Sequence, residues 1–344
     1  MAEFDLGTAR GRIVIDSTGA AAGAAAANAS VNNLKRSSVA TSAALTRTGM
    51  VMGGIGAVAV GAFAYAVNAA ANFEERISGI GAVSGATAAE LDKVREKALQ
   101  LGADTKFSAD QAAQGMEELI KAGLTVEQVL NGAADATTNL AAAGEIELVE
   151  AATISANAMN AFGLAAQDLP KVADLIAGAA NASAIDVGQF GQALAQSGAT
   201  ANLVGLSFDD LAVSIAAMGN AGIKGSDAGT SLKTFLANLQ PTTKKQKELF
   251  DELGITVDGV ANKFFDANGS IKSMSEVAGI LNKATANMTD QQKMLALETM
   301  FGTDAIRAAA IVANNGSEGF DKLSTAMGKV TAAEVAAKRM DNLK

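Results

Sequence analysis

The side chains of this chain that could carry out chemistry are carboxylates, serines and lysines. The 344 residues include no Cys and no His, which excludes disulfides, thiolate nucleophiles, Cys/His zinc sites and imidazole acid–base catalysis. Glycosidase-like or Ser–Lys chemistry stays formally open. A glycosidase needs two carboxylates that face each other across a substrate, whereas adjacent side chains diverge on a helix. The acidic pairs of this chain are adjacent: Glu74/Glu75, Glu117/Glu118 and Asp209/Asp210. We therefore expect solvated faces and helix N-termini, and not an enzyme.

The glycine-rich loop from Gly225 to Gly229 is the other element with a chemical interpretation, as a phosphate cradle. It lacks the Gly-x-x-x-x-Gly-Lys-Ser/Thr spacing of a P-loop, and no strand is predicted before it. We favour a structural interpretation, in which Gly222 caps one helix and Ser226 or Asp227 caps the next. The sequence therefore predicts no catalytic residue, no cofactor and no metal site.

Two further stretches are candidate binding surfaces. The basic cluster Lys244, Lys245 and Lys247 is expected to begin a solvated helix, with a binding role as the less favoured alternative. The run from Met288 to Met300 places Met and Leu at helical spacing. We expect it to pack in the core, and an interaction surface is the second interpretation. The net charge of −9 and the pI of about 4.7 argue against a standing nucleic-acid-binding surface. If the chain contacts DNA, we expect the DNA to move past it without being bound tightly.

The composition predicts that helices position all of these side chains. Ala, Leu and Met are abundant, and there are only two Pro residues and no Trp. A core so poor in aromatic side chains must reach its density through close helix contact, which Ala and Gly permit. We therefore predict an all-α fold with at most one or two short strands or a small hairpin.

Start and stop signals divide residues 87 onward into short amphipathic helices. A hydroxyl residue followed three positions later by Glu or Gln predicts a capping box at Thr87, Ser108, Thr125, Ser273, Thr289 and Thr331. Glycine followed by an apolar residue predicts helix ends at Gly102, Gly123, Gly163 and Gly222. The predicted helices are 88–101, 108–122, 125–142, 146–161, 168–181, 186–197, 207–221, 226–238, 242–252, 274–286, 289–300, 303–314, 317–327 and 331 onward. Asn268-Gly269, between short apolar runs in residues 263–271, predicts a small hairpin.

The segment from Thr48 to Phe73 carries no charge and is long enough for a bilayer span. Its small residues recur every four positions, which predicts a helix-packing stripe of Gly49, Gly53, Ala57 and Gly61. Asn68 and Asn72 are polar, and Ala and Gly insert poorly into membranes. We favour a buried or self-associating helix in a soluble assembly, with a conditional membrane helix as the alternative.

Several passages, in a fixed order, resemble the core region of phage tail tape measure proteins. The most specific runs from Asn220 to Leu232 and includes Gly222, Ile223, Lys224, Gly225 and Gly229, which we call the signature loop. The others are Phe73–Thr87, Leu101–Ala109, Ala141–Leu164 and Met300–Ala305. Together they cover about residues 72 to 330. Each piece is ordinary by itself, and the order and spacing carry the resemblance.

The resemblance implies a helical protein in the lumen of the tail, around which the tube polymerises and whose length sets tail length. It implies contact with copies of itself, with tail tube and tail tip proteins, and with tail assembly chaperones in the host cytoplasm. It also implies exit ahead of the genome at infection. Some family members are thought to line a channel in the host membrane, a role that the uncharged segment would suit.

The sequence limits how much of this role the chain carries. A helical ruler gains about 1.5 Å per residue and must be long and unbroken, whereas short glycine-terminated helices predict a compact domain. We expect an arm and Ala-rich helix in residues 1–47, the apolar helix in 48–75, the core domain in 76–330, and in 331–344 the start of a further helix that continues into the rod. The alternative function is a membrane-associated helical effector or toxin-like protein unrelated to tails.

Overall fold

The computed structural model describes the backbone of residues 53–257 and 261–341, and the side chains of residues 68–257 and 261–341. The chain divides into two compact units, Met1–Asn68 and Ala69–Lys344. The helices are α2 Gly53–Ser84, α3 Ala88–Asp104, α4 Ala109–Lys121, α5 Val126–Gln128, η1 Val129–Ala133, α6 Ala134–Gly144, α7 Leu148–Phe162, η2 Ala166–Asp168, α8 Leu169–Ala182, α9 Val187–Leu203, α10 Phe208–Asn220, α11 Gly225–Ala237, α12 Lys244–Glu252, α13 Met274–Thr285, α14 Asp290–Phe301, α15 Ile306–Met327 and α16 Ala332–Asp341. The strands β1 Thr256–Val257 and β2 Ala261–Asn262 form a small antiparallel pair. The predicted all-α fold is confirmed.

The helix starts lie where the capping pattern predicts them. At Thr87, Ser108, Thr125, Ser273 and Thr289 the hydroxyl accepts from the backbone N–H three residues later, and the Glu or Gln there accepts from the cap's own N–H. The same reciprocal pair joins Thr331 and Glu334. Two further capping boxes, at Asp186 and Thr243, were not predicted.

Three of the four predicted glycine stops are confirmed. Gly123, Gly163 and Gly222 have left-handed φ angles of 107°, 63° and 83°, which a residue without a Cβ adopts without strain. The fourth, Gly102, is wrong, because α3 continues past it to Asp104. A Cβ on Gly102 would lie 2.7 Å from the backbone nitrogen of Ala109. Glycine is needed there because the first turn of α4 approaches α3 closely.

Two other boundaries differ from the prediction, again at glycines. The predicted helix 125–142 is interrupted at Asn131 and Gly132, where the backbone leaves helical geometry and a π turn forms. The two helices predicted on either side of residue 316 run together as α15, which kinks at Gly316 with φ 58°.

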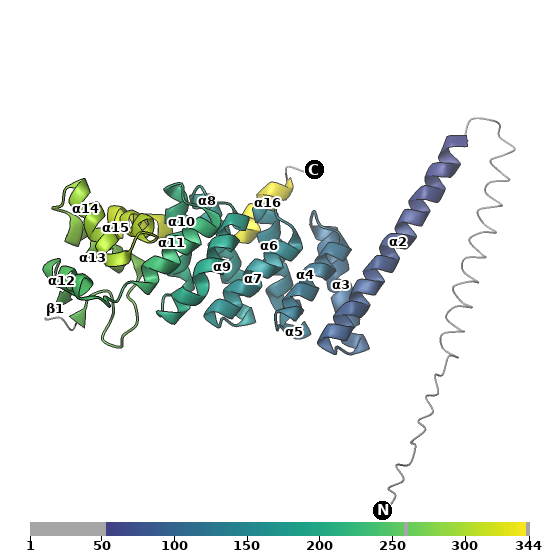
Figure 1. Cartoon of the computed structure of the whole chain (residues 1–344). Coiled ribbons are helices and arrows are strands. Elements are labelled where there is room, and N and C mark those ends of the chain that lie inside the picture. The colour runs from purple at the N-terminus through teal and green to yellow at the C-terminus, as the bar shows by residue number, and fades with distance from the viewer. Residues whose placement is uncertain (1–52, 258–260, 342–344) are drawn as a thin grey trace, which may run out of the picture. The chain divides into compact units, whose positions relative to one another are not determined.

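The helices from α4 to α11 stack in two layers (Figure 1). In the first layer α4 contacts α7, α7 contacts α9, and α9 contacts α11. In the second layer α6 contacts α8, α8 contacts α10, and α10 contacts α15. We call this part of the unit the stack. Each of these helices therefore packs on its neighbours along the stack, as in helical repeat proteins.

The chain then returns along the stack. After α12, α13 and α14, helix α15 packs on α13, α10 and α8, and α16 packs on α6 and α8. The carbonyl oxygen of Met327 would lie 2.3 Å from a Cβ on Gly178, and the N–H of Ala332 donates to Asp174 Oδ1 at 2.7 Å. The predicted start of a further helix after residue 330 is therefore a helix that packs on the core. The expectation that it continues into a rod stays a prediction.

The end of the unit beyond α11 is formed by α12, α13, α14 and the strand pair, and we call it the tip. The predicted hairpin around Asn268-Gly269 is present as a bridge between Phe265 and Ile271. The carboxylate of Asp266 accepts from the N–H groups of Asn268 and Ser270 at 2.8 and 3.0 Å. The two-stranded ladder itself lies a few residues earlier than the prediction, between β1 and β2.

Most of the uncharged segment 48–73 lies outside the residues whose side chains are described. The backbone is helical from Gly53, so Gly53, Ala57 and Gly61 are on a helix, whereas Gly49 and the packing of the stripe lie outside the described part. Residues 1–47, with the predicted arm and Ala-rich helix, lie outside it as well. Among residues 68–257 and 261–341, whose side chains are described, no helix combines the length and the hydrophobicity of a membrane span.

Candidate assembly site

The signature loop lies at the junction between α10 and α11, in the middle of the unit. Gly222 ends α10, and the N–H of Ile223 donates to the carbonyl of Met218 at 2.9 Å, which closes the cap. Ile223 is half-buried against the core, and Lys224 is exposed as the N-cap residue of α11. The loop is thus a tight connection between two consecutive helices that are in contact.

Gly225 and Gly229 face α9. A Cβ on Gly229 would lie 2.3 Å from the carbonyl oxygen of Ala193 and 2.7 Å from Cβ of Gln196. A Cβ on Gly225 would lie 2.6 Å from Gln192 Oε1, and its φ of 57° is also left-handed. The two glycines are one helical turn apart and allow the backbones of α9 and α11 to touch. Their role in this structure is helix packing.

The capping roles predicted for Ser226 and Asp227 are wrong. The N-cap of α11 is Lys224, and no side chain caps this helix. The Asp227 carboxylate instead lies 3.4 Å from the Arg307 guanidinium of α15. Gly225, with a φ of 57°, is the first residue of α11 and turns the chain into the helix. Ser226 and Asp227 therefore lie inside the helix and not at its N-cap.

Two passages of the resemblance meet at α11, although about 70 residues separate them in sequence. Ser231 Oγ donates to the carbonyl of Asp304 at 3.0 Å and accepts from the N–H of Ala308 at 3.2 Å. The rings of Phe235 and Phe301 lie 4.8 Å apart between centroids. The signature loop and the passage Met300–Ala305 thus form one junction between stack, tip and the returning α15.

The passages Phe73–Thr87 and Leu101–Ala109 lie at the other end of the stack, in α2, α3 and the start of α4. Arg76 of α2 pairs with Asp110 of α4 at 2.9 Å. The Arg95 guanidinium pairs with Glu74 at 3.0 Å, and that hydrogen bond holds the pKa of the Glu74 carboxyl below its ordinary value. These passages position one another, and they do not join the signature loop.

The acidic pairs do not converge on a common point. Glu117 pairs with Lys121 at 2.9 Å, and the Asp209 carboxylate pairs with Lys171. Asp210 lies on the same helix as Asp209 but accepts from the N–H of Met274 at 2.9 Å. Within the described residues there is no group of carboxylates that could hold a metal ion. The carboxylates serve as ion-pair partners and caps.

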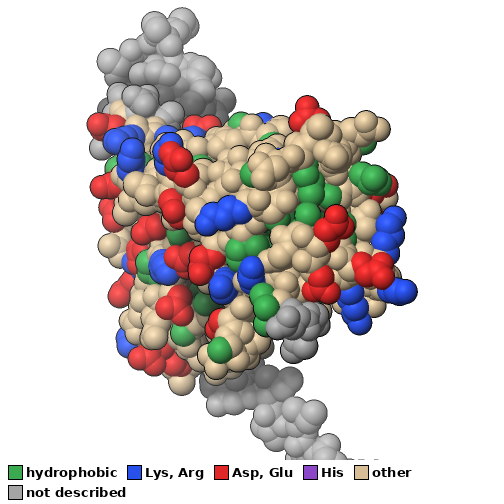
Figure 2. All heavy atoms as spheres, turned by 90° about the vertical axis from the view of Figure 1, so that its left-hand side faces the viewer, with side chains coloured by type: hydrophobic (Ala, Val, Ile, Leu, Met, Phe, Trp, Pro, Cys, Tyr) green, Lys and Arg blue, Asp and Glu red, His purple; other side chains and the backbone are tan. Residues whose placement is uncertain are grey.

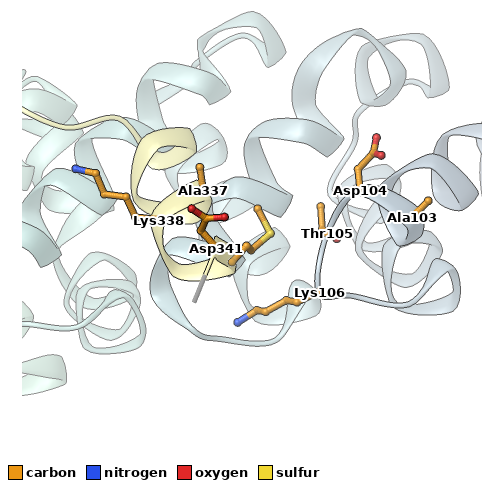
Figure 3. A pocket seen from close by; sticks show the side chains of 8 residues that line it. Ala103, Asp104, Thr105, Lys106, Ala337, Lys338 and Asp341 are labelled. Carbon is orange, nitrogen blue, oxygen red and sulfur yellow. The ribbon is translucent and has the colours of Figure 1, made fainter. Parts of the chain in front are cut away.

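An open depression of about 730 Å³ lies between the α3–α4 loop and α16 (Figure 3). Figure 3 shows its two carboxylates, Asp104 and Asp341, on separate elements and not pointing toward each other. Two lysines, Lys106 and Lys338, also line it. An open, mixed-charge depression of this kind lacks the paired groups of an acid–base site.

Sequence reasoning missed most of the glycine contacts that join helices far apart in sequence. A Cβ on Gly144 would lie 2.7 Å from Val187, one on Gly191 would lie 2.6 Å from Ile154, and one on Gly279 would lie 2.2 Å from Ser317 Oγ. These contacts could have been predicted from the position of each glycine, because a glycine in the middle of a predicted helix often marks the close approach of another backbone.

Comparison with known proteins places this chain among phage tail components. The model of the phage-related minor tail protein family matches residues 95–302. The chain is 34% identical over 273 residues to the tape measure protein of Pneumococcus phage Dp-1, which covers 79% of this chain and 23% of that protein. It is 30% identical over 282 residues to the probable tape measure protein of Escherichia phage P2, with 79% of this chain and 33% of that protein covered.

A third relative, the probable tape measure protein of Clostridium phage phiCD119, is 27% identical over 295 residues, which are 83% of this chain and 30% of that protein. The chain thus spans about a quarter to a third of the length of the curated relatives that it matches. No solved structure matches it significantly.

Proposed function

This chain belongs to the phage-related minor tail proteins, as a tail tape measure protein, and from that premise we propose that residues 69–341 are its compact assembly domain. In this proposal the whole protein templates the tail tube, sets tail length and takes part in genome ejection. The domain contributes a folded body that other tail components contact, and it is not the ruler. The alternative of an effector unrelated to tails is set aside, because the family match runs from α3 to α14.

The observation that carries this proposal is the position of the signature glycines. Two of them, Gly225 and Gly229, lie at the α9–α11 contact, where they have a packing role. The family match covers a folded stack whose helices are mostly short. A continuous helix that serves as a ruler gains about 1.5 Å of length per residue. This domain does not gain length in that way, because α15 and α16 pack back onto the stack.

The partners proposed for the domain are further copies of this chain, the tail tube and tail tip proteins, and tail assembly chaperones met in the host cytoplasm. The protein would then reside in the lumen of the virion tail. No specific binding to nucleic acid is proposed, in keeping with the net charge of −9.

The proposal is tested by complementation in a phage whose gene for this chain is deleted. We expect the deletion to leave heads without tails and the wild-type gene to restore them. Gly229→Leu should fail to restore tails, whereas Gly79→Ala, whose added Cβ meets no atom within 4 Å, should succeed. Tails of normal length in the deletion strain would contradict the proposal.

A second role, as a channel in the host membrane, is favoured by one feature, the absence of charge from residue 48 to residue 73. We propose that this helix inserts only during ejection. Its test is dye release from liposomes by the full chain, with Val60→Glu as the matched variant. Release that Val60→Glu leaves unchanged would contradict this role.

A further inference from the structure

The tip has a mixed surface. Figure 2 looks onto the end of the molecule that contains the tip and shows hydrophobic side chains among charged ones of both signs. The run Met288–Met300, predicted to pack in the core with an interaction surface as the second interpretation, is divided: Met300 is fully buried, whereas Leu295 is 61% exposed. The turn of residues 266–270 belongs to the tip as well, and all five of its residues are exposed. Solvent therefore reaches every residue of this turn.

In a chain without Cys or His, asparagine amides that precede glycine are the groups most open to covalent change without an oxidant or an enzyme. The chain has three such pairs: Asn131-Gly132, Asn268-Gly269 and Asn315-Gly316. Each glycine favours the reaction described below, because it has no Cβ to hinder the approach of its own nitrogen.

The reaction is deamidation. The peptide nitrogen of the glycine attacks Cγ of the asparagine, the bond from Cγ to Nδ2 breaks, and ammonia leaves with the proton that the attacking nitrogen gives up. Water then opens the succinimide ring at either carbonyl carbon, which yields an aspartate or a β-linked isoaspartate. A peptide nitrogen held in a helix or turn does not reach Cγ, so each pair reacts through local opening of the fold.

The pair Asn315-Gly316 is held by the packing of α15 on α13. Asn315 Nδ2 donates to the carbonyl of Ile311 at 2.8 Å. On the residue after the pair, Ser317 Oγ donates to the carbonyl of Ser275 of α13 at 2.9 Å. Opening at this pair must separate the two helices, so we expect it to be rare.

The pair Asn131-Gly132 is held by its place within a run of helices. It belongs to the π turn η1, between α5 and α6, and its neighbours Val129 and Ala133 are buried. Opening here exposes apolar side chains to water, so we expect it to be rarer than the opening of a surface turn.

The pair Asn268-Gly269 lies in the exposed turn, whose hydrogen bonds converge on Asp266. The Asp266 carboxylate accepts from the N–H groups of Asn268 and Ser270, in the manner of an Asx turn. The Asp266 carbonyl accepts from the N–H of Gly269, the attacking nitrogen, at 3.1 Å. Asp266 thus holds the reacting nitrogen in place.

The ends of this turn are fixed, so the turn can open by itself. Phe264 is fully buried, and Ile271 is 7% exposed. The N–H of Ile271 donates to the carbonyl of Val204 at 3.3 Å. Opening of residues 266–270 therefore breaks the bonds to Asp266 and uncovers no core side chain.

We propose that Asn268 is, of the three, the asparagine that deamidates in the folded protein, and that Asp266 limits the rate by holding the turn closed. Asp266 is a positioning residue, since the reacting atoms belong to Asn268 and Gly269. The product places a second carboxylate, or a main chain longer by one carbon, in the turn. This inference goes beyond the proposed function and does not depend on it.

The test follows the three asparagines of the full chain by peptide mass spectrometry, after incubation in heavy-oxygen water that labels each new carboxylate. The rate at Asn268 should exceed those at Asn131 and Asn315 at least tenfold, because only its turn opens without loss of packing. Asp266→Ala should raise the Asn268 rate about tenfold and leave the other two unchanged, because two hydrogen bonds to a charged acceptor are lost. Asp266→Asn, which keeps an acceptor oxygen, should raise it less.

The matched control is Asp104→Ala, which removes a carboxylate at an exposed position of α3 and should change none of the three rates. In urea the three rates should agree to within about threefold, because the unfolded pairs share one chemistry.

A rate at Asn131 or Asn315 that equals the rate at Asn268 overturns the proposal, and so does an Asp266→Ala variant without effect at Asn268. A rise at all three asparagines in that variant also overturns it, because it would indicate loosening of the whole fold. Differences that persist in urea would assign the selectivity to the local sequence and not to the turn, which likewise contradicts the proposal.

Discussion

The stack and the tip differ in what fills their interiors most tightly, although the stack also contains ring contacts of Phe208 with Phe162 and Phe190. In the stack, backbones touch through Gly and Ala, as where α11 lies on Ala193 of α9 at Gly229. In the tip, large rings fill the space: Phe250, Phe264 and Phe301 are fully buried, and their centroids lie 6.0 to 6.5 Å apart. At glycines such as Gly229 the stack therefore has no room for an added atom, whereas the tip depends on the volume of its rings. Substitutions that add or remove volume should separate the two regions.

The largest effect is expected from removing a ring of the tip. Phe301→Ala should lower the free energy of unfolding by about 3–5 kcal/mol, because it removes buried apolar area and leaves a cavity. Phe301 also contacts Phe235 of α11, so the loss should reach the junction with the stack. Urea denaturation of the full chain measures the change. A loss below about 1 kcal/mol would show that the rings do not hold the tip.

A smaller loss is expected from adding one carbon to the stack. Gly229→Ala should lower the free energy of unfolding by about 1–3 kcal/mol, because the backbones of α9 and α11 must separate. Gly79→Ala is the matched control in a helix interior with open space, and it should raise stability by up to about 1 kcal/mol. Equal signs for the two variants, in the same denaturation assay, would contradict the backbone contact.

Helix caps should not distinguish the regions. Ser108 caps α4 in the stack and Thr289 caps α14 in the tip, with the same reciprocal bonds. Replacing either by Ala should cost about 1 kcal/mol in thermal or urea unfolding, and Ser108→Asn should restore most of it. A much larger loss at one cap would mean that the two regions differ in helix stability as well as in packing.

The smallest effect concerns pH. Hydrogen bonds from the backbone N–H and hydroxyl of Thr87 lower the pKa of the Glu90 carboxyl from its ordinary value of 4.5, and Thr331 does the same for Glu334. A carboxyl whose pKa is lower in the folded state stabilises it above the unfolded value, and that stabilisation is lost as pH falls below 4.5 through the folded value. The melting temperature should therefore decline below pH 4.5.

The control for this pH effect is Glu90→Gln, which keeps a capping acceptor without a titrating group. Its melting temperature should decline less steeply than that of wild type over the same range. Parallel curves for the two chains would show that the capping carboxylate does not contribute.

The two regions also differ in what the sequence could predict. Capping boxes are local, since both partners lie within three residues, so the helix starts were predictable in stack and tip alike. A glycine inside a helical pattern, such as Gly102, can indicate either that the helix ends or that another backbone packs closely against it. The sequence alone does not distinguish the two, because the packing partner belongs to another helix. The return of α16 onto α6 depends on such distant contacts. The predicted core density from Ala and Gly holds for the stack, whereas the clustering of phenylalanines in the tip had no local signal.

The central claim is that this domain is a folded body and not the ruler, and tail length tests it most directly. An insertion of about 60 helix-forming residues at the exposed turn Asn268-Gly269 enters a surface position of the tip, where insertions are tolerated. Residues of a ruler would lengthen the tail by about 1.5 Å each, or about 90 Å in all. Electron microscopy of tails from phage carrying this insertion should show unchanged length. Tails about 90 Å longer than wild type would contradict the account.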